Sequence, residues 1–88
     1  MTAPFRKLEL YYFESCPYCQ RVLQVIQKLN LKVQFNDIHG DSRHIQTLIS
    51  ITSRKTVPCL FIDGEPKFES SDIMDWMERN HTELEKNN

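Results

Sequence analysis

The sequence has little net charge, no long hydrophobic run and only three cysteines, and each shortage excludes a class of protein. Eleven lysines and arginines against twelve aspartates and glutamates leave a net charge of −1. No overall field therefore draws the chain to nucleic acid or to anionic lipid. The apolar runs are far shorter than the roughly 20 residues of a membrane span. An odd number of cysteines argues against the disulfide framework of a small secreted domain.

The N-terminus also lacks the marks of a secretory signal, because residues 1–4 have neither a basic start nor an apolar stretch. We therefore expect a cytoplasmic protein, in which two nearby cysteines are more often catalytic or metal-binding than structural. The sequence shows no repeat, low-complexity tract or linker, and its 88 residues suit one domain. That single domain is expected to extend over residues 1–88, with loosely ordered tails at about 1–5 and 83–88.

Segments with a period of two alternate with segments of helical period along the chain. Strands are expected at residues 7–13, 31–38, 58–62 and 65–68. Helices are expected after Ser15 and ending near Asn30, after Ser42, and after Ser70, where serine and aspartate supply cap chemistry. Asp63-Gly64 is a strong hairpin signal. The order βαβαββα predicts an α/β domain in which helices cover a mixed four-stranded sheet.

Cys16 and Cys19 stand three residues apart, after the first strand and at the start of the first helix. On a helical turn this spacing puts both side chains on one face, with Cα atoms about 5–6 Å apart, as a disulfide requires. Free backbone N–H groups and the helix dipole stabilise a thiolate at Cys16. Cys19, one turn further, is the candidate resolving thiol that attacks a mixed disulfide on Cys16.

Two other interpretations of the cysteine pair are inert buried thiols and a zinc site. Structural zinc needs four ligands, commonly two cysteine pairs or one pair with spaced histidines. His39, His44 and His81 do not have the matching spacing, so no metal site is predicted. Cys59 begins an apolar strand and is expected to be a small buried core residue.

The sequence resembles the glutaredoxins of the thioredoxin superfamily in three motifs that together span nearly the whole chain. These are Cys16-Pro17-Tyr18-Cys19, Arg54-Lys55-Thr56-Val57-Pro58 and Ser70-Ser71-Asp72-Ile73. The resemblance implies a thioredoxin-like fold and an oxidoreductase that reduces protein–glutathione mixed disulfides and protein disulfides through Cys16 and Cys19. Glutathione is then the co-substrate, glutathione reductase regenerates it, and no bound cofactor is needed. Such a protein serves electron transport and cell redox homeostasis.

The resemblance also implies a glutathione site. A cis bond between Val57 and Pro58 would expose the main chain of Val57 to the cysteinyl part of glutathione, like an added strand. The backbone N–H groups of Ser70 and Ser71 would hold the γ-glutamyl carboxylate, as a helix N-terminus can. The expected glutathione contacts are Tyr18, Arg54, Thr56, Val57, Pro58, Glu69, Ser70 and Ser71.

Two positions depart from the glutaredoxin pattern. Many glutaredoxins have a lysine three residues before the first cysteine, where this chain has Phe13. Without that cation, carboxylate binding depends more on Arg54, which would face the glycine carboxylate of glutathione. Many members also have two glycines where this chain has Phe68-Glu69. Glu69-Ser70 instead resembles the glutathione-binding segment in the N-terminal domain of glutathione transferases.

Three other functions agree with parts of the sequence. Some glutaredoxin-like domains hold a [2Fe–2S] cluster between two chains, although the Pro17-Tyr18 spacer favours the reductase. Glu69-Ser70 suggests a single-domain transferase-like protein, although the chain ends where the helical second domain of transferases usually begins. The third function is that of a regulator that keeps the fold but has no catalytic activity, and the intact cysteine pair argues against it. We expect a monomer whose partners are glutathione and glutathionylated or disulfide-containing proteins, with neither nucleic acid nor membrane among them.

Overall fold

The computed structural model describes residues 6–87. Its elements are β1 (Leu8–Tyr12), α1 (Pro17–Leu29), β2 (Gln34–Asp37), α2 (Ser42–Thr52), β3 (Cys59–Ile62), β4 (Glu65–Lys67), α3 (Ser70–Asn80) and the 3-10 helix η1 (His81–Glu83). The predicted order βαβαββα is confirmed, and η1 follows it. The sheet has the strand order β2-β1-β3-β4. Because β1 pairs parallel with β2 and antiparallel with β3, the sheet is mixed, as predicted.

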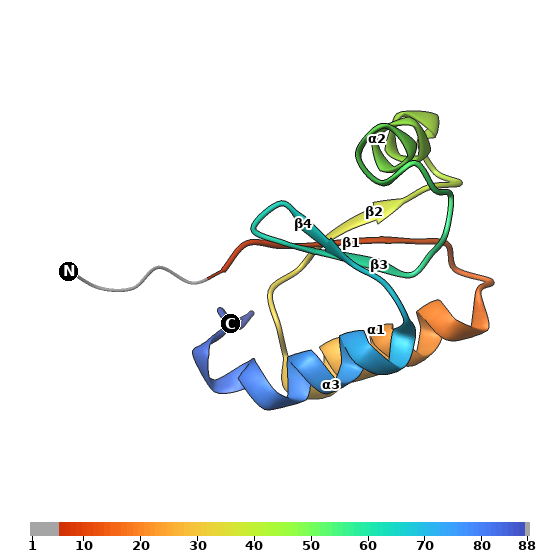
Figure 1. Cartoon of the computed structure of the whole chain (residues 1–88). Helices are drawn as coiled ribbons and strands as arrows, with labels where there is room; N and C mark the ends of the chain where they lie inside the picture. The colour runs from red at the N-terminus through yellow and green to blue at the C-terminus, as the bar shows by residue number, and fades with distance from the viewer. Residues whose placement is uncertain (1–5, 88) are drawn as a thin grey trace.

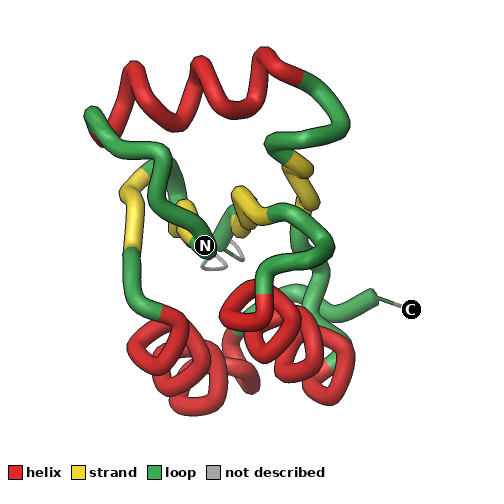
Figure 2. The backbone as a smooth tube through the Cα atoms, turned by 90° about the vertical axis from the view of Figure 1, so that its right-hand side faces the viewer, coloured by secondary structure: helices red, strands yellow, loops and turns green. Residues whose placement is uncertain are grey.

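The elements form three layers, with α2 on one face of the sheet and α1 and α3 on the other (Figures 1 and 2). Because successive side chains of a strand point to opposite faces of the sheet, each face has its own hydrophobic core. Leu10 and Leu60 belong to the cluster under α1 and α3. Tyr11, Cys59 and Phe61 belong to the cluster under α2. Cys59 has no exposed surface, which confirms its prediction as a core residue.

Local chemistry explains where the elements end. The α1 helix ends at Leu29, and its C-cap Asn30 has the left-handed conformation (φ 56°) typical of helix ends. Asp41 caps α2 through its side chain, which accepts a hydrogen bond from the backbone N–H of Arg43 at 2.9 Å. The predicted hairpin is present, since Asp63 and Gly64 both have positive φ (53° and 89°), as a tight hairpin turn requires.

The C-terminal segment differs from the prediction of a loose tail at 83–88. Leu84 is buried in the core under α1 and α3. The backbone N–H of Lys32 donates to the carbonyl oxygen of Glu85 at 2.9 Å, and that of Asn87 donates to the carbonyl oxygen of Asn30 at the same distance. Residues 30–32 thus pair with the C-terminal segment, and β2 begins at residue 34 instead of the expected 31. The expected tail at 1–5, and residue 88, lie outside the described residues.

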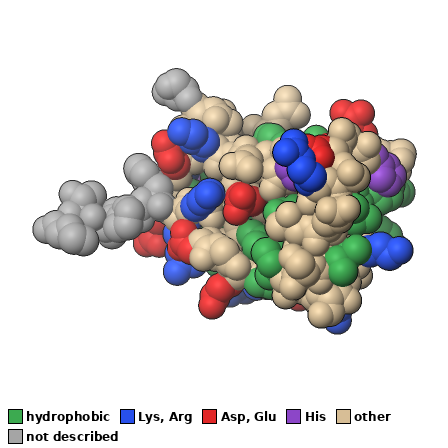
Figure 3. Space-filling model, turned by 90° about the horizontal axis from the view of Figure 1, so that it is seen from above, with side chains coloured by type: hydrophobic (Ala, Val, Ile, Leu, Met, Phe, Trp, Pro, Cys, Tyr) green, Lys and Arg blue, Asp and Glu red, His purple; other side chains and the backbone are tan. Residues whose placement is uncertain are grey.

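The surface over α2 carries charges of both signs. Seen from above, basic and acidic side chains are interspersed, and apolar side chains show between them (Figure 3). This distribution agrees with the net charge of −1. Within residues 6–87, no helix is both long enough and apolar enough to cross a membrane.

Candidate active site

One edge of the sheet brings the three motifs together. β1 and β2 are parallel and therefore end at the same edge. The antiparallel β3 begins there, with Cys59 opposite Tyr11, and β4 ends there, with Lys67 opposite Leu60. The loop into α1, the segment before β3 and the start of α3 consequently meet at this edge (Figure 1). In sheets of this kind, ligands commonly bind beyond the carboxyl ends of parallel strands.

Cys16 is the N-cap of α1. Its backbone is extended (φ −79°, ψ 117°), and Pro17 occupies the first helical position, where no N–H is needed. The Cys16 Sγ accepts a hydrogen bond from the backbone N–H of Cys19 at 3.3 Å, in the place where serine or aspartate normally caps a helix. The Cys16 sulfur therefore lies at the positive end of α1 and accepts a hydrogen bond from one of the first free backbone N–H groups of the helix.

The other two cysteines have different surroundings. Cys19 has no exposed surface, whereas 6% of Cys16 is exposed. Burial, with the hydrogen bond to Cys16 as the second cause, raises the pKa of Cys19 to about 12. Burial likewise raises the pKa of Cys59 to about 12. Both thiols therefore keep their protons at neutral pH. The roles of Cys16 as nucleophile and Cys19 as resolving thiol stay predictions.

The predicted cis bond between Val57 and Pro58 is present. Pro58 is buried, Val57 is half-buried, and Thr56 is exposed beside them. The guanidinium carbon of Arg54 lies 4.7 Å from the centroid of the Phe68 ring, a cation–π contact that holds the cation near the start of α3. The structure thus places Arg54, Thr56 and Val57 at the expected edge. Their contacts with glutathione stay a prediction.

The N-terminus of α3 lacks a side-chain cap among the described residues. Glu69 occupies the N-cap position with φ 72° and makes no capping hydrogen bond through its side chain. The helices α1 and α2 are both capped, by Cys16 and by Asp41. The first backbone N–H groups of α3, at Ser70 and Ser71, are therefore available to an external anion such as a carboxylate.

Two aromatic features flank Cys16. Tyr18 is 60% exposed, the largest exposed fraction among the large apolar and aromatic side chains described. The Phe13 ring stacks on the His39 ring with centroids 4.5 Å apart and 23° between their planes. Sequence reasoning considered His39 only as a metal ligand. The available signal was its position two residues after the end of β2, since Phe13 follows the parallel strand β1.

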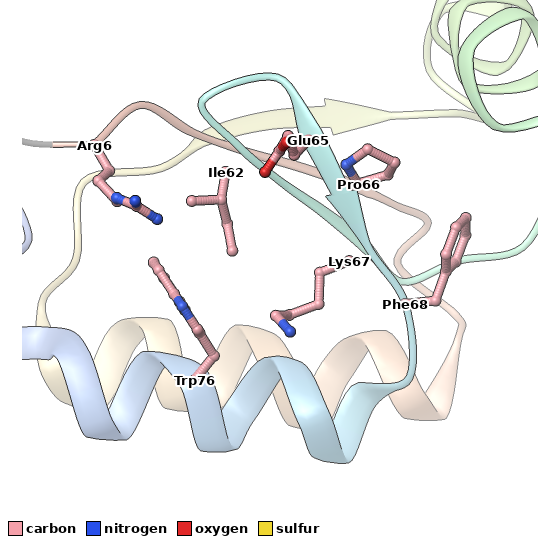
Figure 4. A pocket seen from close by; sticks show the side chains of 7 residues that line it. All are labelled: Arg6, Ile62, Glu65, Pro66, Lys67, Phe68 and Trp76. Atoms are coloured by element: carbon pink, nitrogen blue, oxygen red, sulfur yellow. The ribbon is translucent and has the colours of Figure 1, made fainter.

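No group of three or more histidine, cysteine or acidic residues within residues 6–87 could hold a metal ion. A separate hollow of about 410 Å³ lies between the β3–β4 hairpin and α3 (Figure 4). It is lined by Arg6, Ile62, Glu65, Pro66, Lys67, Phe68 and Trp76. The cysteines do not line this hollow, so it is distinct from the surface around Cys16.

Residues 10–85 match the family model of the glutathione S-transferase N-terminal domain. Glutaredoxin 3 of Escherichia coli (strain K12) is 33% identical over 58 residues, which are 66% of this chain and 70% of that protein.

Solved structures share the fold. Reduced glutaredoxin C1 of Populus tremula x tremuloides has a TM-score of 0.68 at 23% identity, over 85% of this chain and 67% of that one. A glutathione transferase homologue of Drosophila mojavensis with bound glutathione has a TM-score of 0.75 at 18% identity. The match covers 88% of this chain and 36% of the transferase homologue, so the chain spans about a third of that protein.

Proposed function

The chain belongs to the glutaredoxin family of the thioredoxin superfamily, and we propose that it reduces protein–glutathione mixed disulfides with glutathione as co-substrate. Family membership makes it a glutaredoxin-type thiol oxidoreductase, and its sequence also matches the N-terminal domain of glutathione S-transferases. The observation that carries the finer proposal is the Cys16 sulfur at the N-cap of α1, 3.3 Å from the backbone nitrogen of Cys19.

In the proposed reaction, the Cys16 thiolate attacks the glutathione sulfur of the mixed disulfide. A new S–S bond forms between Cys16 and glutathione, the original S–S bond breaks, and the protein leaves as a thiolate that takes up a proton. A second glutathione thiolate then attacks this intermediate and releases oxidised glutathione. The N–H of Cys19 stabilises the Cys16 thiolate, which makes Cys16 a good leaving group in this second step.

For protein disulfides, the Cys16 thiolate first attacks one sulfur of the substrate and forms a mixed disulfide with it. Cys19 then attacks Cys16, so that the Cys16–Cys19 bond forms, the mixed disulfide breaks and the substrate leaves with both sulfurs reduced. Two glutathione molecules reduce the cysteine pair again and leave as oxidised glutathione. Burial is the main reason for the raised pKa of Cys19, and the neighbouring Cys16 sulfur adds to it through a hydrogen bond and its charge. Once Cys16 is held in a mixed disulfide it carries no charge, so that part of the barrier to ionising Cys19 disappears. Cys19 is therefore reactive mainly when there is a disulfide on Cys16 to resolve.

Glutathione is proposed to lie on the β3 side of Cys16. The main chain of Val57 pairs with its cysteinyl part, and the start of α3 at Ser70 and Ser71 binds its γ-glutamyl carboxylate. Support comes from the exposed segment before the cis proline and from the uncapped helix. Arg54, which contacts Phe68, supplies a cation for the glycine carboxylate.

A coupled assay tests the proposal. The mixed disulfide of glutathione and mercaptoethanol is supplied with glutathione, glutathione reductase and NADPH, and NADPH oxidation is followed. Cys16→Ser is expected to abolish turnover, because no other described cysteine has a helix-capping position. Cys19→Ser is expected to keep deglutathionylation and lose the reduction of protein disulfides. Cys59→Ala is the matched control and is expected to keep both activities. Turnover by the Cys16→Ser variant would show that the nucleophile is wrongly assigned.

A second candidate function is glutathione conjugation, favoured by the match of residues 10–85 to the transferase domain. Conjugation needs only a glutathione thiolate and an electrophile, and it does not use a second cysteine. A chlorinated nitrobenzene with glutathione provides the test. Conjugation without reduction of the small mixed disulfide would favour the transferase, whereas reduction without conjugation would favour the glutaredoxin.

A further inference from the structure

The sheet order divides the surface around Cys16 into two sides. The strands lie in the order β2-β1-β3-β4, and the loop that carries Cys16 leaves the end of β1. The proposed glutathione site occupies the side of β3, β4 and α3. The opposite side is formed where β1 and β2 end, at Phe13 and His39. A substrate larger than glutathione has this second side available for its protein part.

The Phe13–His39 stack is fixed to the loop of the nucleophile. The backbone N–H of Cys16 donates to the carbonyl oxygen of Phe13 at 3.2 Å. The backbone N–H of His39 donates to Asp37 Oδ1 at 2.9 Å, and the N–H of Ile38 donates to the carbonyl oxygen of Tyr12 at 2.9 Å. His39 is exposed and Phe13 is half-buried, so the stack presents an aromatic surface to solvent beside Cys16.

Charged side chains lie on both sides. The β2 side carries Asp37 and Glu14, and both carboxylates lie close enough to the Tyr12 phenol to raise its pKa, after burial as the main cause. Asp41 on the same side is neutralised by Arg43, whose Nη2 lies 2.8 Å from its carboxylate.

The β3 side carries the exposed cations Arg54 and Lys55 together with the exposed carboxylates of Glu69 and Asp72. Arg54 and Lys55 suit the carboxylates of glutathione, whereas the β2 side combines an aromatic stack with carboxylates.

We propose that the Phe13–His39 stack, together with Glu14 and Asp37, binds the polypeptide part of the substrate and selects an arginine next to the glutathionylated cysteine. A guanidinium is planar, stacks on aromatic rings and pairs with carboxylates, so it fits both features of this side. The inference rests on the proposed function and names its substrate class. The chemical step is unchanged: glutathione passes to Cys16, and the arginine-containing protein leaves as its thiolate.

Three glutathionylated peptides that differ only in the residue after the cysteine test the selection. With arginine at this position, kcat/KM is expected to exceed that of the leucine peptide about three- to tenfold, and glutamate is expected to be poorer than leucine. The difference should appear mainly in KM and should shrink as salt is added, because exposed charges are screened. Equal rates for arginine and leucine, or faster turnover of leucine, would overturn the inference.

Charge-neutralising variants identify the surface. Glu14→Gln with Asp37→Asn removes two charges, and the amide introduced by the second substitution keeps an oxygen for the N–H of His39. The arginine-to-leucine ratio of kcat/KM is expected to fall to near one. The matched control is Glu65→Gln with Glu83→Gln, which removes two charges far from Cys16 and should keep the ratio. His39→Ala, which deletes the stack, should lower the ratio as well. An unchanged ratio in the first variant would contradict the inference.

An assay with the mixed disulfide of glutathione and mercaptoethanol distinguishes failure of the proposed function from failure of the inference about arginine. If the wild-type protein does not reduce this small substrate, the proposed function is wrong. If it reduces the small substrate but shows no preference for arginine, only the assignment of the β2 side is wrong.

Discussion

Glu69 has a backbone conformation that glycine adopts more easily than any other residue. Its φ of 72° and ψ of 114° lie outside the regions allowed without strain for a side chain with a Cβ. The chain must turn sharply here, from β4 into α3. Such strain persists where the surroundings enforce it, and it is common at ligand sites. Glycine at this position would adopt the same conformation without strain.

Replacement of Glu69 by glycine is therefore expected to increase the free energy of unfolding by about 1 kcal/mol, because the strain of the positive φ is removed. Urea denaturation measures this change. Glu78→Gly, in the interior of α3, is the matched control and should lower the free energy of unfolding by about 1 kcal/mol. A destabilised Glu69→Gly variant would show that the glutamate backbone is not strained. Glutathione affinity of the same variant tests the predicted contact separately.

The buried thiols predict a dependence of stability on alkaline pH. In the folded chain, burial raises the pKa of Cys19 and of Cys59 from 9.0 to about 12. Below pH 9 both thiols are protonated in the folded and unfolded states, so they do not change the free energy of unfolding. Between about pH 9 and 12 the unfolded chain has lost these protons and the folded chain has kept them, so the free energy of unfolding falls as pH rises.

Denaturation at a series of pH values between 8 and 11, in roughly unit steps, measures this slope. The variant Cys19→Ala with Cys59→Ala is expected to be less sensitive to alkali than the wild type. A smaller slope should persist in it, because burial also raises the pKa of Tyr11 and Tyr12. Equal slopes in the two proteins would mean that the thiols ionise normally in the folded state.

At the scale of single residues, the sequence predicted correctly those positions that depend only on neighbouring residues in the chain. Asn30 and Asp63 were placed correctly, because each depends only on neighbours along the chain. The contact of Phe13 with His39 could not be predicted from local patterns, because it depends on the register of β1 and β2. The pKa of Cys19 likewise depends on packing that no spacing reveals.

At the scale of elements, the C-terminal segment shows how one apolar residue can anchor a polar stretch. Residues 81–88 contain a single leucine among polar and charged residues, so no periodicity marks them as structured. Their partners lie more than 50 positions earlier, where Lys32 binds Glu85 and Asn30 binds Asn87. The other elements have strong periodicity and were predicted in the correct order.

The anchor can be tested at Leu84, of which only 2% is exposed. Leu84→Ala is expected to lower the free energy of unfolding by about 2–5 kcal/mol, because it leaves a cavity under α1 and α3. Its neighbour Glu83 is exposed, and Glu83→Ala should change the free energy by no more than about 0.5 kcal/mol. Thermal and urea denaturation compare the two. Equal stability would mean that the segment contributes nothing to the core.

At the scale of the whole molecule, strand direction decides which motifs meet. The three motifs are separated by up to about 50 positions in the sequence, and the βαβαββα order alone does not bring them together. They converge because β1 runs parallel to β2 and antiparallel to β3, so that β1 ends where β3 begins. The resemblance to glutaredoxins predicted this arrangement, whereas composition and periodicity predicted only the class of fold.

The open start of α3 has a consequence for the molecule as a whole. Its first backbone N–H groups have no side-chain acceptor within residues 6–87, so an anion that arrives from solution completes the helix. The contact that recognises a ligand is then also the contact that finishes a piece of secondary structure. If glutathione binds there as proposed, recognition and local order would be a single event, and release of the ligand would loosen the first turn of α3.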